Sequence, residues 1–297
     1  MKRSLFKFIT VWMLLLLSFA GLFSISASAD AEMRRVVIGA DLSEEQIQQI
    51  YQLFGFSRGS VPELYLTNVE ERAALDGFVE PAVIGTRAIS SVYLELLPQN
   101  SGMSITTENI SWCTAEMYLN ALTTGGITDA KIAVAAPFSV SGTAALAGVY
   151  KAYEDMTGQK LDDQAKTVST QQLTITCELA NEIGSADSTS IVKELKSMLN
   201  QTVVMSDDEL RSTIRRIAEQ YHVQLTDTQV QQLLDLCRAL EKLNPDALGK
   251  RVNDIQNTLE KVSDAKDQVV GFLQTIRNVF DAVRSFFERI NSLFNGR

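Results

Sequence analysis

The sequence predicts a mixed α+β or α/β fold, in which helices cover a sheet and an all-helical C-terminal region follows. Three observations predict it. Short β-type runs alternate with helical runs from Met33 to Gly158, strand patterns stop after Gly158, and apolar residues then recur every three or four positions. The chain is therefore expected to contain four parts: a leader at 1–29, an α/β domain at 30–158, a helical region at 159–243 and a long amphipathic helix at 244–297.

The first 29 residues have the pattern of a secretory signal peptide. Lys2, Arg3 and Lys7 supply a positive start, and an uncharged stretch follows that turns small and polar at its end. We therefore expect cleavage between Ala29 and Asp30 and a working protein outside the cytoplasm. The alternative is an uncleaved anchor, because the uncharged run approaches the roughly 20 residues that span a bilayer.

Charge and residue usage exclude several classes of site. Loss of the leader removes three of the 27 basic residues and none of the 36 acidic ones, so the net charge falls from −9 to −12, which disfavours nucleic-acid binding. His222 is the only histidine and no C-x-x-C spacing occurs, so we expect no metal and no cofactor. Cys113, Cys177 and Cys237 allow at most one internal disulfide, and Cys237 is expected to be a buried hydrophobe.

Within the α/β region, two β-rich stretches at 88–97 and 103–110 are separated by Pro98 and a turn at 100–102, which predicts a hairpin. Lys131–Phe138 is the clearest candidate for a buried strand. Other strands are expected at Val36–Ile38 and Glu63–Thr67, and helices are expected to follow caps at Ser43, Asn68 and Ser111 and to span Thr143–Met156.

The C-terminal part shows helix starts and a long apolar seam. Helix N-termini are predicted at Asp187 or Ser188, Ser206, Thr226 and Asn244. From Leu248 to Phe294 apolar residues step by four and three, which is typical of a coiled coil, and self-association or an envelope partner is expected there. The arginine-rich second half leaves contact with a membrane surface as an alternative.

Four segments carry a resemblance to a known family. They are Thr67–Glu71, Ile84–Ser91, Met117–Leu122 and Ala136–Leu146. Together they resemble the YpuA-like family of exported proteins from Gram-positive bacteria, whose conserved domain has no assigned function. The resemblance implies export and supplies no reaction, cofactor or catalytic residue.

The strongest candidate site is the turn after the predicted strand Lys131–Phe138. A strand that ends in a Gly/Ser turn at a helix N-terminus directs N–H groups and hydroxyls toward one point, which favours an anion. Ser139, Ser141, Gly142 and Thr143 are therefore candidate ligands for a phosphate or carboxylate. The simpler interpretation is that Ser141 or Thr143 caps the helix.

A second candidate joins Asn68, Glu70 and Glu71 to Arg87. If the two loops meet, Arg87 would pair with a carboxylate and fix a polar pocket. The alternative is that Asn68 caps a helix and that the two acids lie on the surface.

These patterns favour a non-enzymatic binding or association protein of the extracytoplasmic space or cell envelope. No G-x-S-x-G elbow precedes any serine, and one histidine gives little support for a catalytic triad. Two alternatives stay open: an envelope hydrolase that uses carboxylates or Ser141, and a protein that binds a small anion.

Overall fold

A computed structural model describes residues 33–243, which fall within one compact unit. The predictions for the leader, its cleavage at Ala29 and Asp30, the helix start at Asn244 and the seam from Leu248 to Phe294 lie outside these residues.

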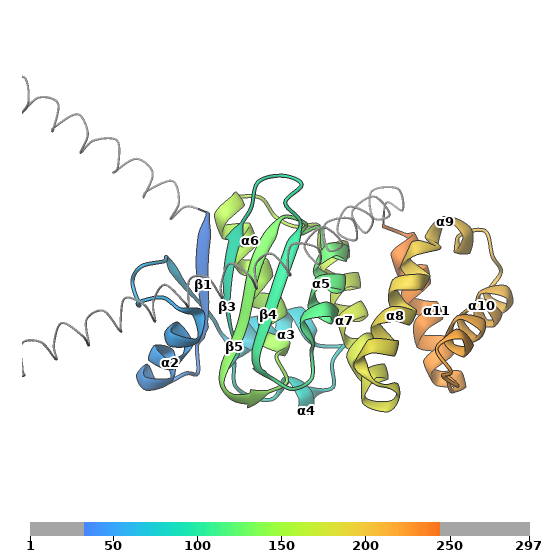
Figure 1. Cartoon of the computed structure of the whole chain (residues 1–297), viewed down its shortest axis with the longest axis horizontal. Coiled ribbons are helices and arrows are strands. Elements are labelled where there is room, and N and C mark those ends of the chain that lie inside the picture. Colours follow the sequence, from blue (N-terminus) through green and yellow to red (C-terminus); the bar gives the residue numbers. More distant parts are fainter. Residues whose placement is uncertain (1–32, 244–297) are drawn as a thin grey trace, which may run out of the picture. The chain divides into compact units, whose positions relative to one another are not determined.

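The core of the fold is a five-stranded mixed sheet, which confirms the predicted fold class (Figure 1). The strand order is β2-β1-β3-β5-β4. β1 and β2 are parallel, as are β4 and β5, whereas β3 runs antiparallel to both of its neighbours. The strands span Arg34–Gly39 (β1), Glu63–Leu66 (β2), Ser91–Leu96 (β3), Met103–Ile110 (β4) and Ala130–Val140 (β5).

The predicted hairpin between β3 and β4 is wrong, because β5 lies between them. Ile132 of β5 pairs with Leu94 on one side and with Ile105 on the other. The reason is burial. β5 carries the apolar run that needs neighbours on both sides, whereas β4 exposes alternate polar residues and fits the edge of the sheet.

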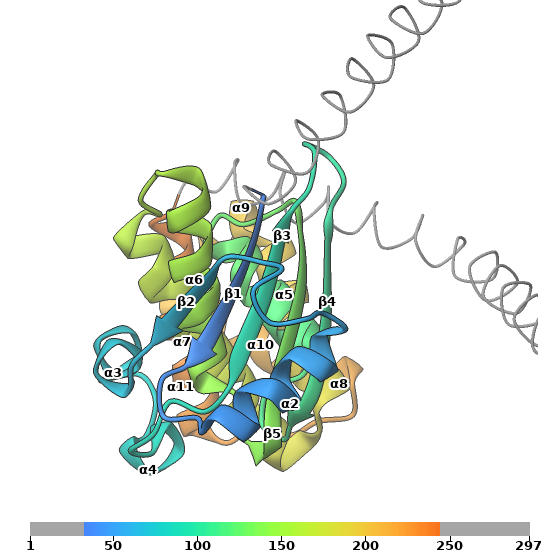
Figure 2. The same ribbon diagram turned by 90° about the vertical axis from the view of Figure 1, so that its left-hand side faces the viewer.

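Helices cover both faces of the sheet (Figure 2). α2 (Glu44–Phe54) packs on the face that carries Val36 and Tyr93. α6 (Thr143–Thr157) packs on the opposite face, where Gly148 lets the helix approach Val37 and Val92 closely. α3 (Asn68–Leu75) lies against α6, and α5 (Ala115–Thr124) lies against β4.

The helical region begins with α7 (Asp163–Ile183), which packs against α5 (Figure 1). Its other helices are α8 (Ser185–Ser197), α9 (Leu199–Thr202), α10 (Asp207–Gln220) and α11 (Asp227–Glu241), and they share an apolar core with α7. Cys237 is buried in that core, as predicted. Between residues 33 and 243, no helix combines the length and the apolar character that a membrane span requires.

Three predicted helix starts are confirmed by complete capping boxes, at Ser43, Ser206 and Thr226. Two predicted caps are wrong. Thr67 rather than Asn68 caps α3, because the Glu70 carboxylate closes the box with Thr67 while Glu71 turns inward.

The second wrong cap lies before α5, where Thr114 replaces Ser111. The Ser111 hydroxyl donates instead to the Val140 carbonyl. α8 also begins earlier than predicted, at Ser185, because Gly184 at φ 91° ends α7 immediately before it.

Candidate functional site

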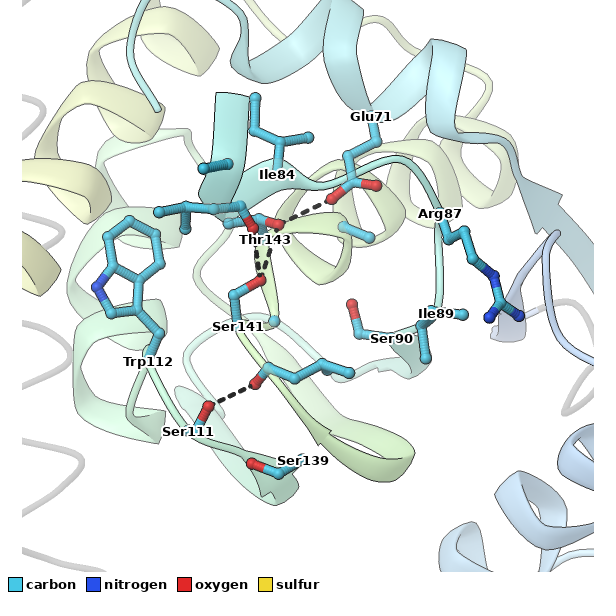
Figure 3. Close-up of a pocket in the computed structure, with 15 residues that line it drawn as sticks. Glu71, Ile84, Arg87, Ile89, Ser90, Ser111, Trp112, Ser139, Ser141 and Thr143 are labelled. Atoms are coloured by element: carbon cyan, nitrogen blue, oxygen red, sulfur yellow. Dashed lines mark hydrogen bonds between the residues drawn. The ribbon is translucent and has the colours of Figure 1, made fainter. Parts of the chain in front are cut away.

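The turn from Ser139 to Thr143 and the loop of Arg87 face one pocket of about 460 Å³ (Figure 3). The short helix α4 (Pro81–Ile84), α3 and the loop before α5 complete its walls. In Figure 3, Trp112 and Arg87 lie toward opposite sides of the pocket, and Glu71, Ser141 and Thr143 lie between them. The structure therefore brings together segments that are far apart in the sequence.

A buried carboxyl group forms part of the pocket. Glu71 projects inward from α3 and is only 1% exposed. Its Oε1 lies 2.8 Å from the Thr143 hydroxyl, and its Oε2 accepts a hydrogen bond of 3.2 Å from Asn68 Nδ2. Burial raises the pKa of Glu71, and the hydrogen bonds from Thr143 and Asn68 oppose that shift only in part.

The Thr143 hydroxyl donates to this carboxyl group and the Ser141 hydroxyl donates to a backbone carbonyl, and neither of them caps the helix. Gly142 is the N-cap of α6 and supplies no side-chain hydrogen bond, so the prediction that Ser141 or Thr143 caps α6 is wrong. Ser141 Oγ lies 3.3 Å from Thr143 Oγ1 and donates to the Val83 carbonyl at 3.1 Å. The physical reason is that Glu71 and Val83 offer acceptors inside the pocket.

A count of protons shows which form of Glu71 suits this cluster. Three contacts form a chain from Glu71 through Thr143 and Ser141 to the Val83 carbonyl, and each contact needs one proton. The two hydroxyls supply two protons. Thr143 donates to Glu71 and Ser141 donates to the Val83 carbonyl, so no proton is left for the 3.3 Å contact between the two hydroxyls. A proton on Glu71 would reverse the first contact and free the Thr143 proton for Ser141. Burial raises the pKa of Glu71, which acts in the same direction as this proton count.

Gly142 holds the turn in place through a close contact with Tyr118. The Tyr118 hydroxyl donates to the Gly142 carbonyl, and burial raises the pKa of that phenol well above its usual value. Gly142 has φ 93°, and a Cβ atom there would lie 2.4 Å from the Tyr118 hydroxyl. Glycine is thus required both by the backbone conformation and by the space.

The other predicted site residues have different roles. Arg87 is exposed at the pocket, and its guanidinium donates to the backbone carbonyl of Asp41 at 2.7 Å. Asn68 does not line the pocket, and its link to the pocket is the hydrogen bond that it donates to Glu71. Glu70 lies outside it, where it closes the capping box with Thr67 and pairs with Lys151.

A second pocket, of about 660 Å³, contains Glu70 and is lined by alternating charges. Glu154 in this pocket pairs with Lys160 and Lys166 at 2.8 and 3.0 Å. Burial alone would raise the pKa of Glu154, but the two lysines hold it below its usual range. These acids are neutralised in pairs, so we place the candidate site at the first pocket.

The family profile described as "Protein of unknown function (DUF1002)" matches residues 38–279. The chain belongs to the DUF1002 family. This DUF1002 protein is also 34% identical, over 275 residues, to the "Uncharacterized protein YpuA" of Bacillus subtilis (strain 168). The aligned part covers 90% of this chain and 92% of that protein. No solved structure matches the chain.

The chemistry available in the pocket of this DUF1002 protein is hydrogen bonding beside an aromatic wall. Across residues 33–243, no cluster of three or more histidine, cysteine or acidic side chains is arranged to hold a metal ion. His222 lies at the end of α10, away from the pocket. The sequence left Glu71 open as a pocket carboxylate paired with Arg87 or as a surface acid, and it gave no signal for Trp112, because nothing local to Trp112 shows that it faces a pocket.

Proposed function

We propose that this DUF1002 protein is exported and acts as a non-enzymatic binding protein of the extracytoplasmic space, with the pocket around Glu71, Ser141 and Thr143 as its ligand site. The N-terminal leader pattern supports export. The observation that carries the binding role is the buried Glu71, whose hydrogen-bond chain is complete when the carboxyl is neutral. Such a cluster carries no net charge, and the lone pairs that its hydroxyl oxygens keep free can accept from a ligand.

The ligand class that fits this lining is a small uncharged molecule with several hydroxyl groups, such as a sugar unit. Sugar hydroxyls can donate to the lone pairs that Ser141 and Thr143 keep free. Trp112 gives the pocket an aromatic wall for the apolar face of such a ligand. An anion is less favourable. Its negative charge would lie beside the Glu71 carboxyl group and would be repelled whenever that group is ionised.

The hydrolase alternative has less support. Among the residues that line this pocket within the described chain, Glu71 is the single acid and histidine is absent. Glycosidases use two carboxyl groups about 5 to 9.5 Å apart, so the pocket lacks the second one. Ser141 donates its proton to a backbone carbonyl, which does not activate it as a nucleophile.

Thermal unfolding with small probes tests the binding role. We expect N-acetylglucosamine to raise the melting temperature of the wild type and to have no effect on a Ser141→Ala variant. Ser197→Ala, on the exposed side of α8, is the matched control and should respond like the wild type. A rise caused by inorganic phosphate that Ser141→Ala removes would contradict the proposal and favour an anion site. No response to the sugar in any variant would also count against it.

We further propose that the segment from Leu248 to Phe294 joins the protein to a second copy or to an envelope partner. Its apolar residues recur at the spacing of a coiled-coil seam. Deletion of Leu248 to Arg297 should lower the number of chains per particle, measured from the mass in solution, or release the protein from the envelope fraction. An unchanged oligomeric state together with unchanged fractionation would contradict this. Binding of the full chain to anionic lipid vesicles, lost on deletion, would favour the membrane-surface alternative.

A further inference from the structure

Two cysteines from distant parts of the chain meet in the interior. Cys113 lies in the connection between β4 and α5, and Cys177 lies near the middle of α7. Their Sγ atoms are 3.3 Å apart, although 64 residues separate them in the sequence. The two side chains are 1% and 0% exposed. A disulfide bond is about 2.05 Å long, so a small side-chain rotation would bring the sulfur atoms to bonding distance.

The surroundings of this pair favour a structural bond over a reactive thiol. Met117 Sδ lies 3.6 Å from Cys177 Sγ, and burial raises the pKa of the Cys177 thiol. A thiol that stays protonated is a poor nucleophile and a poor metal ligand. Cys237 is buried separately, among the apolar residues of α7, α8, α10 and α11.

We propose that Cys113 and Cys177 are joined by a disulfide bond in the exported protein. This inference rests on the proposed export, because cytoplasmic thiols are kept reduced whereas extracytoplasmic ones are oxidised. The bond would connect the part of the chain that carries the sheet to the first helix of the helical region, where α5 and α7 already pack together. Cys237 stays a free thiol.

The oxidant is a disulfide, either that of a thiol–disulfide oxidoreductase or that of a small-molecule thiol. One cysteine thiolate attacks it, so that half of the oxidant leaves as a thiol while the other half forms a mixed disulfide with the protein. The second cysteine then displaces the other half of the oxidant. Two S–H bonds and one S–S bond break, and one S–S bond and two S–H bonds form, so two electrons pass to the oxidant. Because both sulfur atoms are buried in the folded chain, the exchange occurs while the chain folds.

Thiol labelling of the mature protein tests the proposal. The protein is collected from the extracytoplasmic fraction, denatured without reductant and treated with N-ethylmaleimide. We expect one label per chain, on Cys237, and a proteolytic peptide that joins Cys113 to Cys177. After reduction, three labels are expected.

Three labels without reductant, on a chain that begins at Asp30, would overturn the disulfide while export stands. Three labels on an intracellular chain that retains Met1 would overturn the proposed export, and the disulfide with it. A peptide that joins Cys237 to either of the other cysteines would also overturn the assignment.

Two single variants add an independent readout. A bond that closes a loop of this length should raise the melting temperature by on the order of 10 °C. Reductant should therefore lower the melting temperature of the wild type and of Cys237→Ala by this amount. Cys113→Ala should show no dependence on reductant. An equal effect of reductant on the melting temperature of all three proteins would contradict the proposal. The labelling result is obtained on the wild type, so it does not depend on whether a variant folds.

Discussion

Replacement of Lys196 by methionine is expected to make the stability of this protein less dependent on pH. Lys196 lies on α8 and is 2% exposed. Its Nζ donates to the backbone and side-chain oxygens of Asn120 at 2.8 and 2.9 Å, and within residues 33–243 no carboxylate forms an ion pair with it. Burial lowers the pKa of Lys196 to about 7.

The magnitude follows from proton linkage. Between the folded pKa of about 7 and the ordinary lysine pKa of 10.5, the unfolded chain holds a proton on this side chain that the folded chain lacks. Stability therefore rises with pH across this window, and it is lowest below pH 7, where folding buries the ammonium. At about 1.36 kcal/mol per pKa unit, the contribution of Lys196 changes by at most about 5 kcal/mol.

Hydrogen bonding reduces this figure. The two oxygens of Asn120 stabilise the ammonium, which opposes the effect of burial. We therefore expect the change to lie between roughly 2 and 5 kcal/mol. Methionine has a similar length and no charge, so it removes the pH-dependent part. The hydrogen bonds that it also removes add an offset that does not depend on pH.

Urea unfolding at pH 7 and at pH 10 measures the effect. The free energy of unfolding of Lys196→Met minus that of the wild type should be lower at pH 10 than at pH 7 by roughly 2 to 4 kcal/mol. Subtraction cancels the titration of other groups, including the buried tyrosines. Lys193→Met, on the half-exposed side of the same helix, is the control and should give equal differences at both pH values. Equal differences at pH 7 and pH 10 for Lys196→Met would refute the reasoning.

Three further substitutions test the site and the fold. Gly142→Ala should destabilise the protein by roughly 2 to 5 kcal/mol in urea unfolding, because of its positive φ and the contact with Tyr118, and a change below about 1 kcal/mol would contradict this. Because burial raises the pKa of Glu71, the wild type should lose stability as pH rises above about 4.3. Glu71→Gln should not show this loss, because glutamine does not titrate. An equal fall of melting temperature with pH in both proteins would contradict a neutral acid. Thr226→Ala should cost about 1 kcal/mol through loss of the α11 cap, again measured by urea unfolding.

Helix starts could be predicted where the signal is contained within one turn. Ser206 with Glu209 and Thr226 with Gln229 cap their helices as expected, because each box joins a residue to one three positions away. The predicted cap of α3, Asn68, lies one residue after the actual cap, Thr67. There the choice of cap depended on Glu71 turning toward Thr143, 72 residues further along the chain.

The candidate site was predicted in part for the same reason. Ser139, Ser141, Gly142 and Thr143 follow a clear strand and precede a clear helix, so their turn could be recognised locally. What the turn does was not predictable. Thr143 donates to a carboxyl group from another helix and Ser141 donates to the Val83 carbonyl, and neither hydroxyl caps its own helix.

By itself, the sequence determined the family, the mixed fold class and the change to helices after Gly158, since motifs, periodicity and caps are properties of short segments. Only the tertiary structure decided that β5 lies between β3 and β4, that Glu71 is buried and that Cys113 meets Cys177. These features depend on which apolar surfaces cover one another. Segments separated by 60 residues or more must pack together to achieve that coverage, and no local pattern encodes it.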